Sequence, residues 1–411
     1  MLEFVKNILR PSYHYAWALG SALVAGFPAQ RMTVIGVGGT KGKSTVSEMI
    51  FAILREAGIT TALIGTIRFA VGDESQPNKL KMTMPGRGFI QRFLARAKRK
   101  GATHAILELT TEGARQSRHR FLYLDALIMT NVQKEHIESH GSFEKYVARK
   151  WDIVRELEKS PKPRRAIIVN TDDEWNAKFT GAHVPTRIPY SIKDTPDTTT
   201  TALSTTFTYN GARIALPLTG TFNAANALAA IRVCEHLGIP LATIVSALEK
   251  LAPVPGRVEF VRGGQNFDVV VDYAHTPDSL KALYAAFPRQ KKICVLGNTG
   301  GGRDTWKRPA MGKIADEMCD TVILTNEDPY DEDPRAIVDA MAKGMERTPT
   351  VVMDRREAIR EALRQAQAAD QNVVVLISGK GTDPFIMGPR GQRETWSDAQ
   401  VVKEELEKIV H

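Results

Sequence analysis

The chain has 411 residues, of which 43% are apolar and 25% are charged, and its formal net charge is +9. This length exceeds one ordinary hydrophobic core, so the sequence predicts two or three domains. No run of about 18 apolar residues is present, which excludes a helix that spans a membrane, and the basic balance suits anionic partners such as nucleotides, nucleic acid or lipid headgroups.

The segment from Tyr13 to Phe27 is apolar and aromatic, with a few polar or small interruptions. It lacks a small-residue cleavage pattern, so it does not read as a signal peptide. Two interpretations remain for it. One is a helix that packs on the following domain, and the other is an interfacial helix that rests on a bilayer beside Lys6 and Arg10.

A glycine-rich stretch, Gly36 to Thr45, follows an apolar run at 32–35 and precedes a helix-like segment at 46–57. A strand, a glycine loop and a helix form the context in which a phosphate loop works, because backbone N–H groups turn inward and the helix N-terminus adds positive potential. Lys43 can then reach the outer phosphates, and the Ser44 hydroxyl can hold Mg²⁺.

The phosphate-loop pattern is imperfect. The usual template places a glycine five positions before Gly42, and here that position is Val37. The alternative interpretation is a glycine-rich turn that contains a Gly-Lys-Ser triplet by chance.

Strand-like runs alternate with helix-like segments from here on, and we expect strands at 32–37, 61–67, 104–109, 125–130 and 165–169. This alternation predicts an α/β fold with an open, doubly wound parallel sheet and helices on both faces. Ligands in such sheets bind beyond the carboxyl ends of the strands. Gly36 onward, Glu108 and Asn131 all fall at such ends.

Three side chains after these strands are candidates for chemistry. Glu108 is either a Mg²⁺-binding carboxylate or a surface acid at a strand end. His136 is either a metal or phosphate ligand or a structural histidine. Lys150 lies in a charged helix-like run at 143–157, and this spacing favours a solvated face over catalysis.

Residues 194–210 are rich in Thr and Ser and predict an exposed strand-and-turn region, and 220–237 predicts a helix. Pro253, Pro255 and Gly256 mark a domain boundary. A second alternating series follows, with strands expected at 267–272, 291–296, 321–325, 350–353 and 372–377. The expected division is a short N-terminal helical segment (1–30), a central domain that contains the glycine-rich loop (31–252) and a C-terminal Rossmann-like α/β domain (253–411).

The cysteines, Cys234, Cys294 and Cys319, lie far apart in the chain without a CxxC pair. This spacing argues against a zinc site or a disulfide framework and fits a reducing cytosol.

Polar clusters also follow the strands of the second series. Asp272 ends one strand and can accept ribose hydroxyls. The glycine loop at 297–302 is followed by several cations, which indicates an anion site facing the first loop, or else a basic surface turn. The acidic loop at 326–334 and the loop at 379–383 could recognise an amine, although solvated turns are the usual meaning of such stretches.

Taken together, these segments resemble the Mur ligase family, and within it the MurE type, from residue 32 to about residue 400. The pieces that carry the resemblance are GxxGTxGKST at 36–45, TN…EHxxxHG at 130–141, GxFNxxN at 220–226, PGRxE at 255–259, DYAHTPDSL at 272–280 and KRPxMG at 307–312. Their order and spacing both match.

The resemblance implies an ATP- and Mg²⁺-dependent ligase of peptidoglycan biosynthesis. ATP would phosphorylate a carboxylate of the acceptor peptide, and the amine of an amino acid would attack the acyl phosphate. A carboxylate is a poor electrophile, and phosphate transfer to it needs dense positive charge.

The resemblance also assigns site residues. Those for ATP are Gly39, Thr40, Lys41, Gly42, Lys43, Ser44, Thr45, Asn223, Asn226, Arg257, Asp272 and His275. Those for metal are Ser44, Glu108, His136 and Lys150 as a carbamate, and with Lys43, Asn223, Arg257 and Asp272 these form the catalytic set. Those for the acceptor are Thr83, Thr111, Gln116 and Arg118. Those for the amino acid are Arg303, Glu327, Asp328, Tyr330, Gly379 and Asp383.

Several features depart from the family pattern. Some thirty residues precede the loop where the family has a UDP-binding domain, so the acceptor can be membrane-bound or shorter. The Ser-Ser-His after the metal Glu is replaced at 110–112, and the loop at 297–303 has an extra residue. The Asp-Asn-Pro-Arg motif of diaminopimelate-adding enzymes ends here in Tyr330, which cannot pair bidentately with a carboxylate. We therefore expect another amino acid, such as lysine or ornithine.

Two alternatives to a MurE-like ligase remain: an amide ligase of the folylpolyglutamate or cyanophycin type, and a non-catalytic Mur homologue that acts as a subunit. The expected partners are small-molecule substrates, without nucleic acid, because the basic residues at 87–100 lack interleaved stacking aromatics. We expect a cytoplasmic monomer, with possible membrane contact through the N-terminal segment.

Overall fold

The computed structural model describes residues 2–86, 88–133, 141–201, 203–302, 304–369 and 372–410. The chain divides into two compact units. The first comprises residues 1–199, 205–217 and 222–251, and the second comprises residues 200–204, 218–221 and 252–411.

The first unit is built on an eight-stranded sheet in the order β4-β3-β2-β5-β1-β6-β7-β8. Its strands are β1 (Thr33–Gly38), β2 (Thr61–Ile64), β3 (Arg68–Val71), β4 (Glu74–Pro77), β5 (His104–Glu108), β6 (Ala126–Met129), β7 (Ala166–Asn170) and β8 (Thr186–Tyr190). Six of them run parallel, while β3 and β4 return antiparallel at one edge. The parallel core at the predicted strands confirms the predicted α/β class.

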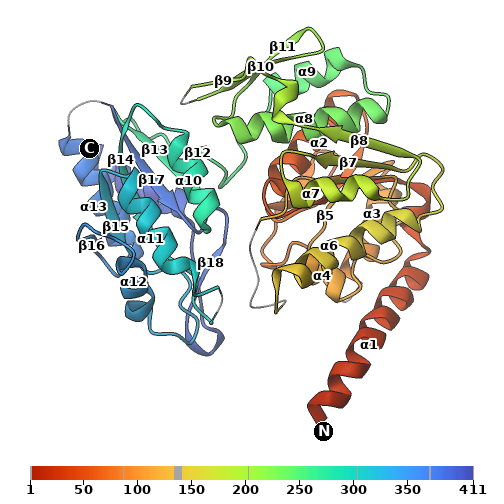
Figure 1. Ribbon diagram of the computed structural model, residues 1–411, viewed down its shortest axis with the longest axis horizontal. Coiled ribbons are helices and arrows are strands. Elements are labelled where there is room, and N and C mark those ends of the chain that lie inside the picture. Colours follow the sequence, from red (N-terminus) through yellow and green to blue (C-terminus); the bar gives the residue numbers. More distant parts are fainter. Residues whose placement is uncertain are drawn as a thin grey trace. The chain divides into compact units, whose positions relative to one another are not determined.

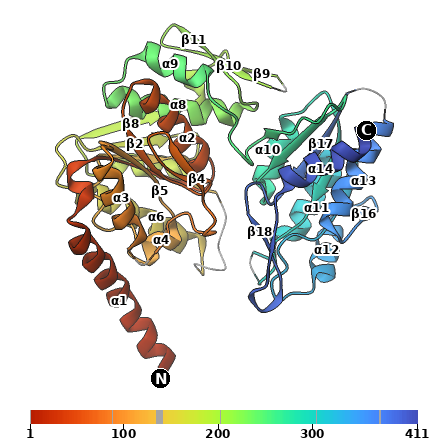
Figure 2. The ribbon, with the colours of Figure 1, turned by 180° about the vertical axis from the view of Figure 1, so that it is seen from behind.

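Helices cover both faces of this sheet (Figure 1). The helices of the first unit after residue 40 are α2 (Lys43–Glu56), α3 (Phe89–Arg99), α4 (Thr111–Arg115), α6 (Phe143–Glu158), α7 (Glu174–Ala177), α8 (Thr221–His236) and α9 (Leu241–Glu249), with 3₁₀ turns at Pro28–Arg31, Lys178–Gly181 and Ile192–Asp194. Figure 2 shows α2 on the opposite side of the strands from α3 and α6. Val34 of β1 packs with the α3 and α6 side chains, whereas its neighbour Ile35 points to the other face.

A smaller antiparallel sheet contains β9 (Thr199–Thr200), β10 (Thr205–Tyr209) and β11 (Ala212–Leu216). In β10, every second residue is buried, because one face of this sheet packs inward. The Thr- and Ser-rich stretch is therefore a sheet with one buried face rather than a wholly exposed region.

The chain begins with a 24-residue helix, α1 (Leu2–Ala25). Its second half packs on the first unit: the rings of Tyr15 and Phe121 lie 5.6 Å apart, and Ala22 is completely buried. Among the described residues, no helix is both long enough and apolar enough to cross a bilayer.

The second unit contains a six-stranded sheet in the order β12-β13-β17-β14-β15-β16. The strands are β12 (Glu259–Phe260), β13 (Asp268–Asp272), β14 (Lys291–Leu296), β15 (Thr321–Leu324), β16 (Thr350–Val351) and β17 (Val373–Ser378), and a separate hairpin pairs β18 (Phe385–Met387) with β19 (Arg393–Thr395). All of the sheet's pairings except the antiparallel β12 edge are parallel.

Two layers of helices sandwich the second sheet. Side chains of α10 (Pro277–Ala285), α11 (Lys307–Met318) and α12 (Pro334–Ala342) share a core with one face of it. Those of α13 (Arg355–Ala368) and α14 (Asp398–Val410) share a core with the other face, and a 3₁₀ turn lies at Pro389–Gly391. This is the doubly wound arrangement that the sequence predicts for the C-terminal part.

Cys294 and Cys319 form a disulfide bond with an S–S distance of 2.11 Å and a Cα–Cα distance of 6.3 Å. The argument from spacing against a disulfide is therefore wrong for this pair. Strands β14 and β15 are parallel neighbours, so the chain that returns through α11 brings Cys319, just before β15, alongside β14.

Candidate active site

The glycine-rich loop lies where the sheet of the first unit places polar groups together. Strand β1 runs between β5 and β6, and Val37 is in register with Glu108. Helix α2 begins at Lys43, directly after Gly42, which has φ 83°. The free N–H groups and the dipole of this helix therefore point at the loop, which suits an anion such as a phosphate.

Two glycines of the loop have no room for a side chain. A Cβ at Gly39 would lie 1.9 Å from Thr130 Oγ1, and a Cβ at Gly42 would lie 2.4 Å from Asn226 Oδ1. Val37, where the usual template has glycine, is instead a fully buried residue of β1. The sequence therefore differs from the template within the strand, whereas the two turn positions that have no room for a side chain are both glycine.

Lys43 extends over the loop that precedes it. Its Nζ donates to the carbonyls of Thr40 at 2.8 Å and Gly39 at 3.1 Å. Asn131 at the end of β6 fixes the loop from the other side, because its Oδ1 accepts from Lys41 N at 2.8 Å. The ammonium group and the backbone donors therefore lie on one small surface.

Ser44 and Glu108 are in direct contact. Ser44 Oγ donates to Glu108 Oε2 at 3.1 Å, and the Glu108 side chain is only 2% exposed. The interpretation of Glu108 as a surface acid is thus wrong. Thr66 also binds this carboxylate, through its N–H to Oε1 at 2.9 Å and its hydroxyl to Oε2 at 2.7 Å. A hydroxyl and a carboxylate beside a phosphate loop are the oxygen donors that suit Mg²⁺.

Lys150 is buried, with 2% of its surface exposed. Its Nζ lies 4.7 Å from the centre of the Tyr146 ring, and the Tyr146 hydroxyl is 2.9 Å from Thr40 Oγ1. Arg149 on the same helix is half-exposed. The expectation of a solvated face therefore holds for Arg149 and is wrong for Lys150, which α6 directs toward the loop.

His136 lies outside the described residues. In the part of the chain that the structure describes, no group of three or more His, Cys, Asp or Glu side chains gathers as a metal site would. Ser44 and Glu108 match a Mg²⁺ ion that takes most of its ligands from phosphates and water.

Thr83, predicted to bind the acceptor, connects to the pair of Ser44 and Glu108. Its hydroxyl lies 2.9 Å from the Thr66 hydroxyl, which in turn donates to Glu108. A continuous chain of hydrogen bonds thus runs from Ser44 through Glu108 and Thr66 to Thr83. Sequence reasoning missed Thr66, and its position just after β2 at the same sheet edge is the signal that could have found it.

The other acceptor residues lie around α4. Thr111 begins this helix and is 8% exposed. Arg118 Nη2 donates to Gln116 Oε1 at 2.5 Å, and Arg118 Nη1 donates to the carbonyl of Met84, in the same loop as Thr83. The structure therefore brings the acceptor set together on one side of the first unit.

His119, next to Arg118, is a buried histidine whose two ring nitrogens have no hydrogen-bond partner among the described residues. Burial, with a smaller effect of Arg120, lowers the pKa of His119 from 6.5 to about 4. Between pH 6.5 and 4, His119 is therefore protonated in the unfolded chain but largely neutral in the folded protein. We predict that the stability of the first unit falls by about 3 kcal/mol as the pH drops from 6.5 to 4.

Urea unfolding at a series of pH values measures this effect. His119→Phe should flatten the dependence, and the matched variant His183→Phe, at an exposed histidine, should leave it unchanged. An equal slope in wild type and His119→Phe would contradict the assignment.

Asn223 and Asn226, on the first turns of α8, lie against the phosphate loop. Asn226 Nδ2 donates to Asn223 Oδ1 at 3.1 Å, and both side chains are buried. Asn226 Oδ1 is the atom that leaves no room at Gly42. The fold therefore brings these two residues, some 180 positions further along the chain, to the loop as the resemblance implies.

In the second unit, Arg257, Asp272 and His275 form one cluster at the end of β13. The Arg257 guanidinium lies 4.6 Å from the centre of the Tyr273 ring. The centres of the Tyr273 and His275 rings are also 4.6 Å apart. Asp272 accepts from Val258 N at 2.8 Å, which holds the segment of Arg257 in place. A flat aromatic ring, a guanidinium and a carboxylate suit a nucleoside with phosphate groups.

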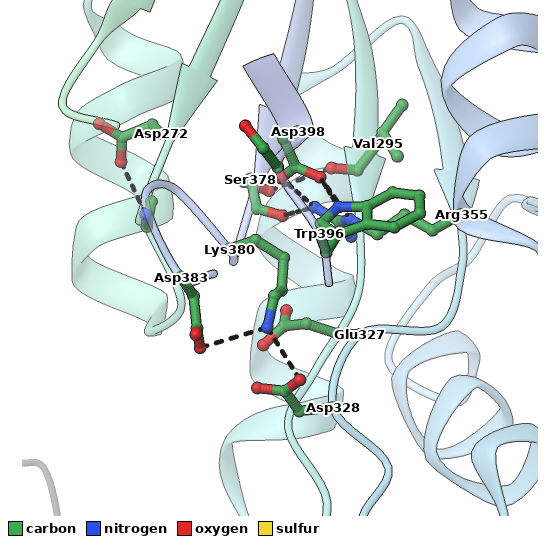
Figure 3. A network of polar contacts seen from close by, with 12 residues as sticks. Asp272, Val295, Glu327, Asp328, Arg355, Ser378, Lys380, Asp383, Trp396 and Asp398 are labelled. Atoms are coloured by element: carbon green, nitrogen blue, oxygen red, sulfur yellow. Dashed lines mark hydrogen bonds and ion pairs between the residues drawn. The ribbon is translucent and has the colours of Figure 1, made fainter. Parts of the chain in front are cut away.

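The two acidic loops of the second unit meet around Lys380 (Figure 3). Its Nζ lies 2.8 Å from Asp328 Oδ1 and 3.2 Å from Asp383 Oδ2, and Asp328 also accepts from Met387 N at 2.8 Å. Lys380 and Asp328 are 1% and 4% exposed. The interpretation as solvated turns is wrong for Asp328, whose charge is already balanced by a cation of the same unit.

Glu327 is also buried, at 3% exposure, and one of its oxygens accepts from Thr299 Oγ1 at 2.8 Å. Its Oε2 has no hydrogen-bond partner among the described atoms and lies 2.1 Å from where a Cβ at Gly379 would be. Burial raises the pKa of Glu327, although Arg355 and Lys380 oppose this. Tyr330 adopts a left-handed φ of 52°, and Arg303 lies outside the described residues.

Comparisons with known proteins place these features in context. The family model described as Mur ligase middle domain matches residues 37–234, and that described as Mur ligase, glutamate ligase domain matches residues 256–381. The chain is 33% identical to UDP-N-acetylmuramoyl-L-alanyl-D-glutamate–2,6-diaminopimelate ligase of Bacillus cereus, over 93% of this chain and 79% of that protein. It is 34% identical to UDP-N-acetylmuramyl-tripeptide synthetase 2 of Oceanobacillus iheyensis, over 92% and 78%.

Solved structures agree with the sequence comparison. A structure of a UDP-N-acetylmuramoyl-L-alanyl-D-glutamate–2,6-diaminopimelate ligase superposes with a TM-score of 0.63 at 28% identity, over 92% of this chain and 79% of that one. Folylpolyglutamate synthase of Mycobacterium tuberculosis superposes with a TM-score of 0.73 over 89% and 92%, but at 16% identity, which shows the fold alone.

Proposed function

Because the chain belongs to the Mur ligase family and is an ATP-dependent ligase that forms amide bonds, we propose that it joins an amino acid to a carboxylate of a peptidoglycan-precursor peptide. The relatives that support this substrate class carry UDP-N-acetylmuramoyl-L-alanyl-D-glutamate or muramyl tripeptide in their names. The likeness to folylpolyglutamate synthase concerns the fold and supports no second substrate.

The observation that carries this proposal is the hydrogen-bonded chain from Ser44 through Glu108 and Thr66 to Thr83. It joins the phosphate loop to the acceptor side of the same unit within a few side chains. A ligase that transfers a phosphoryl group to a carboxylate needs these two sites in contact, because the reacting atoms must approach within about 3–3.5 Å.

The residues have distinct roles in this proposal. Lys43 and the loop N–H groups bind the outer phosphates of ATP, and Ser44 and Glu108 hold one Mg²⁺, which would neutralise charge on those phosphates. A carboxylate oxygen of the acceptor attacks the terminal phosphorus and ADP leaves. The amine nitrogen of the amino acid then attacks the activated carbonyl carbon, phosphate leaves, and the nitrogen loses a proton.

Lys150 is assigned a role as a carbamate that helps to bind a second Mg²⁺ together with His136. Its burial beside Tyr146 and the loop supports a role in the site rather than at the surface. Carbamylation would replace the buried amino group of Lys150 with a carboxylate-like group, whose oxygens suit a hard cation. We therefore predict that Lys150→Ala lowers the rate of ADP release by roughly 10- to 100-fold.

Short carboxylates such as acetate and propionate should partly restore the Lys150→Ala activity, because they supply the missing oxygens. Arg149→Ala is the matched control, since it removes a neighbouring, half-exposed cation that pairs with Asp152; its activity should stay near that of wild type. Restoration by alkylamines, with no response to carboxylates, would argue for a cationic role of Lys150.

We propose that the amine of the incoming amino acid is recognised by the loops around Glu327 and Gly379. Tyr330 stands where diaminopimelate-adding enzymes carry arginine, so we expect lysine or ornithine to be preferred to diaminopimelate. A screen that measures ADP release with each amino acid checks this expectation, and a clear preference for diaminopimelate would contradict it.

One assay tests the function as a whole. The purified chain is mixed with ATP, Mg²⁺, a pool of amino acids and UDP-N-acetylmuramoyl-L-alanyl-D-glutamate, and ADP release and product mass are measured. We expect ADP release that depends on both the acceptor and the amino acid, and a product heavier than the acceptor by one amino-acid residue. Turnover that stays undetectable with every acceptor would favour a non-catalytic subunit.

We further propose a monomeric enzyme that works in the cytoplasm on soluble small molecules, without nucleic acid. Exposed apolar side chains on α1, among them Trp17 and Leu23, support contact with a membrane surface. Light scattering of the purified chain tests the monomer.

A further inference from the structure

A cavity of about 460 Å³ lies between α1 and the loops that carry the acceptor residues. Tyr13, His14 and Trp17 of α1 line one side of it. The other side contains Met82, Pro85 and Gly86 from the loop of Thr83, together with Gln91, Gln116, Arg118 and Arg120. Two of the residues assigned to the acceptor, Gln116 and Arg118, are therefore part of this wall.

Two arginines, Arg118 and Arg120, line the cavity. Arg118 is half-buried and forms no ion pair with the described residues, since its bonded partners are the Met84 carbonyl, the Met82 sulfur and the Gln116 amide oxygen. The pKa of His14 is lowered by burial and also by the nearby guanidinium groups of Arg10, Arg118 and Arg115. Arg115 is balanced by Glu112 and Arg120 by Glu156, so Arg118 is the guanidinium of this wall that suits a phosphate-bearing ligand.

The aromatic side of the cavity is open to a ligand ring. Tyr13 and Trp17 lie one helical turn apart with their ring centres at 6.5 Å, and they are 59% and 48% exposed. Exposed aromatic faces of this kind bind the flat face of a sugar or a base through apolar contact and stacking. Guanidinium groups and aromatic faces in one cavity fit a ligand that combines phosphates with a ring.

We propose that this cavity binds the glycosyl-diphosphate part of the acceptor, away from its reacting carboxylate, and that α1 supplies the aromatic wall. This inference rests on the proposed ligase function. The loop at 82–86 connects the two ends of the acceptor, because Thr83 bonds to the Glu108 network while Pro85 and Gly86 line the cavity. The same chemistry can come from a soluble nucleotide sugar or from a polyprenyl-linked sugar at a membrane surface.

Binding measurements without ATP or amino acid test the proposal on the full chain. The soluble probe is UDP-N-acetylglucosamine, followed by calorimetry. The membrane probe is a phosphatidylcholine vesicle that contains a polyprenyl-diphosphate sugar, followed by co-sedimentation against plain phosphatidylcholine vesicles. The variant Tyr13→Ala/Trp17→Ala should weaken binding of whichever probe the wild type takes by about tenfold or more.

Tyr15→Ala is the matched control, because Tyr15 is an exposed aromatic residue of the same helix that contacts Phe121 and does not line the cavity. The Kd of this variant should stay within about twofold of the wild-type value, well below the tenfold change expected for the double variant. Binding of the soluble probe identifies a nucleotide sugar as the source, and binding of the sugar-bearing vesicles alone identifies the lipid-linked form.

Two results would overturn the proposal. One is that neither probe binds, where sedimentation equal to that with plain vesicles counts as no binding of the membrane probe. The other is equal binding by wild type and the double variant. These outcomes are distinct from failure of the ligase function. A chain that binds the probe and releases no ADP retains this site and refutes the ligase. An active ligase whose acceptor KM is the same in the double variant and in Tyr15→Ala refutes this site alone.

Discussion

Lys43→Ala should reduce the rate of ADP release by at least about 100- to 1,000-fold, because a preorganised donor to the transferring phosphoryl group contributes roughly 2.7–4 kcal/mol to the transition state. The Lys43 ammonium lies over the loop carbonyls of Gly39 and Thr40, on the surface where the helix N-terminus and the backbone donors converge. Steady-state ADP release with saturating acceptor and amino acid measures the effect.

Lys403→Ala is the control for this experiment, since it removes an exposed lysine of α14. Both variants should unfold close to the wild-type temperature, because both lysine side chains reach solvent. Turnover of Lys43→Ala at the wild-type rate would rule out the phosphate-loop assignment.

Asp398→Ala should destabilise the second unit by about 3–5 kcal/mol, because it leaves the buried Arg355 guanidinium without its counter-charge. The side chains of Arg355 and Asp398 are 1% and 0% exposed, with N–O distances of 2.7 and 2.8 Å (Figure 3). Trp396 Nε1 also donates to Asp398 at 2.7 Å, so this indole would lose its partner as well. Urea unfolding of wild type and variant measures the difference.

The control is Asp339→Ala, which breaks the exposed pair with Arg335 on α12. An exposed pair contributes about 0–1 kcal/mol, so this variant should stay close to wild type. Arg355→Met/Asp398→Ala should recover much of the lost stability, because it removes the stranded charge as well. A change below about 1 kcal/mol in Asp398→Ala would contradict the assignment of a buried ion pair.

Most of the fold is predictable from local pattern, because buried parallel strands are short apolar runs between helical segments. The strands that escape prediction lie at or near the sheet edges. β4 is exposed along its whole length, and β8 alternates in exposure and contains Pro189, so neither resembles a buried run. The prediction of strand, glycine loop and helix at 32–57 is confirmed by β1 and α2.

The candidate site was harder to predict where its chemistry depends on partners distant in sequence. Lys150 stands among charged neighbours, and only its spacing of four residues from Tyr146 marks a shared helix face. Asp328 belongs to an acidic run that resembles a solvated turn, whereas the cation that balances it, Lys380, comes from a loop 52 positions later. Such pairings follow from strand order, which local composition does not specify.

The carboxylate of Glu108 accepts hydrogen bonds from two residues at once, from the hydroxyl of Ser44 beside the glycine loop and from the N–H and hydroxyl of Thr66 on the side of Thr83. Any occupant that draws this group toward one of them loosens its hold on the other. Such influence is reciprocal, because the two binding free energies share one coupling term. We therefore expect a nucleotide at the loop and an acceptor near Thr83 to change each other's affinity by the same factor.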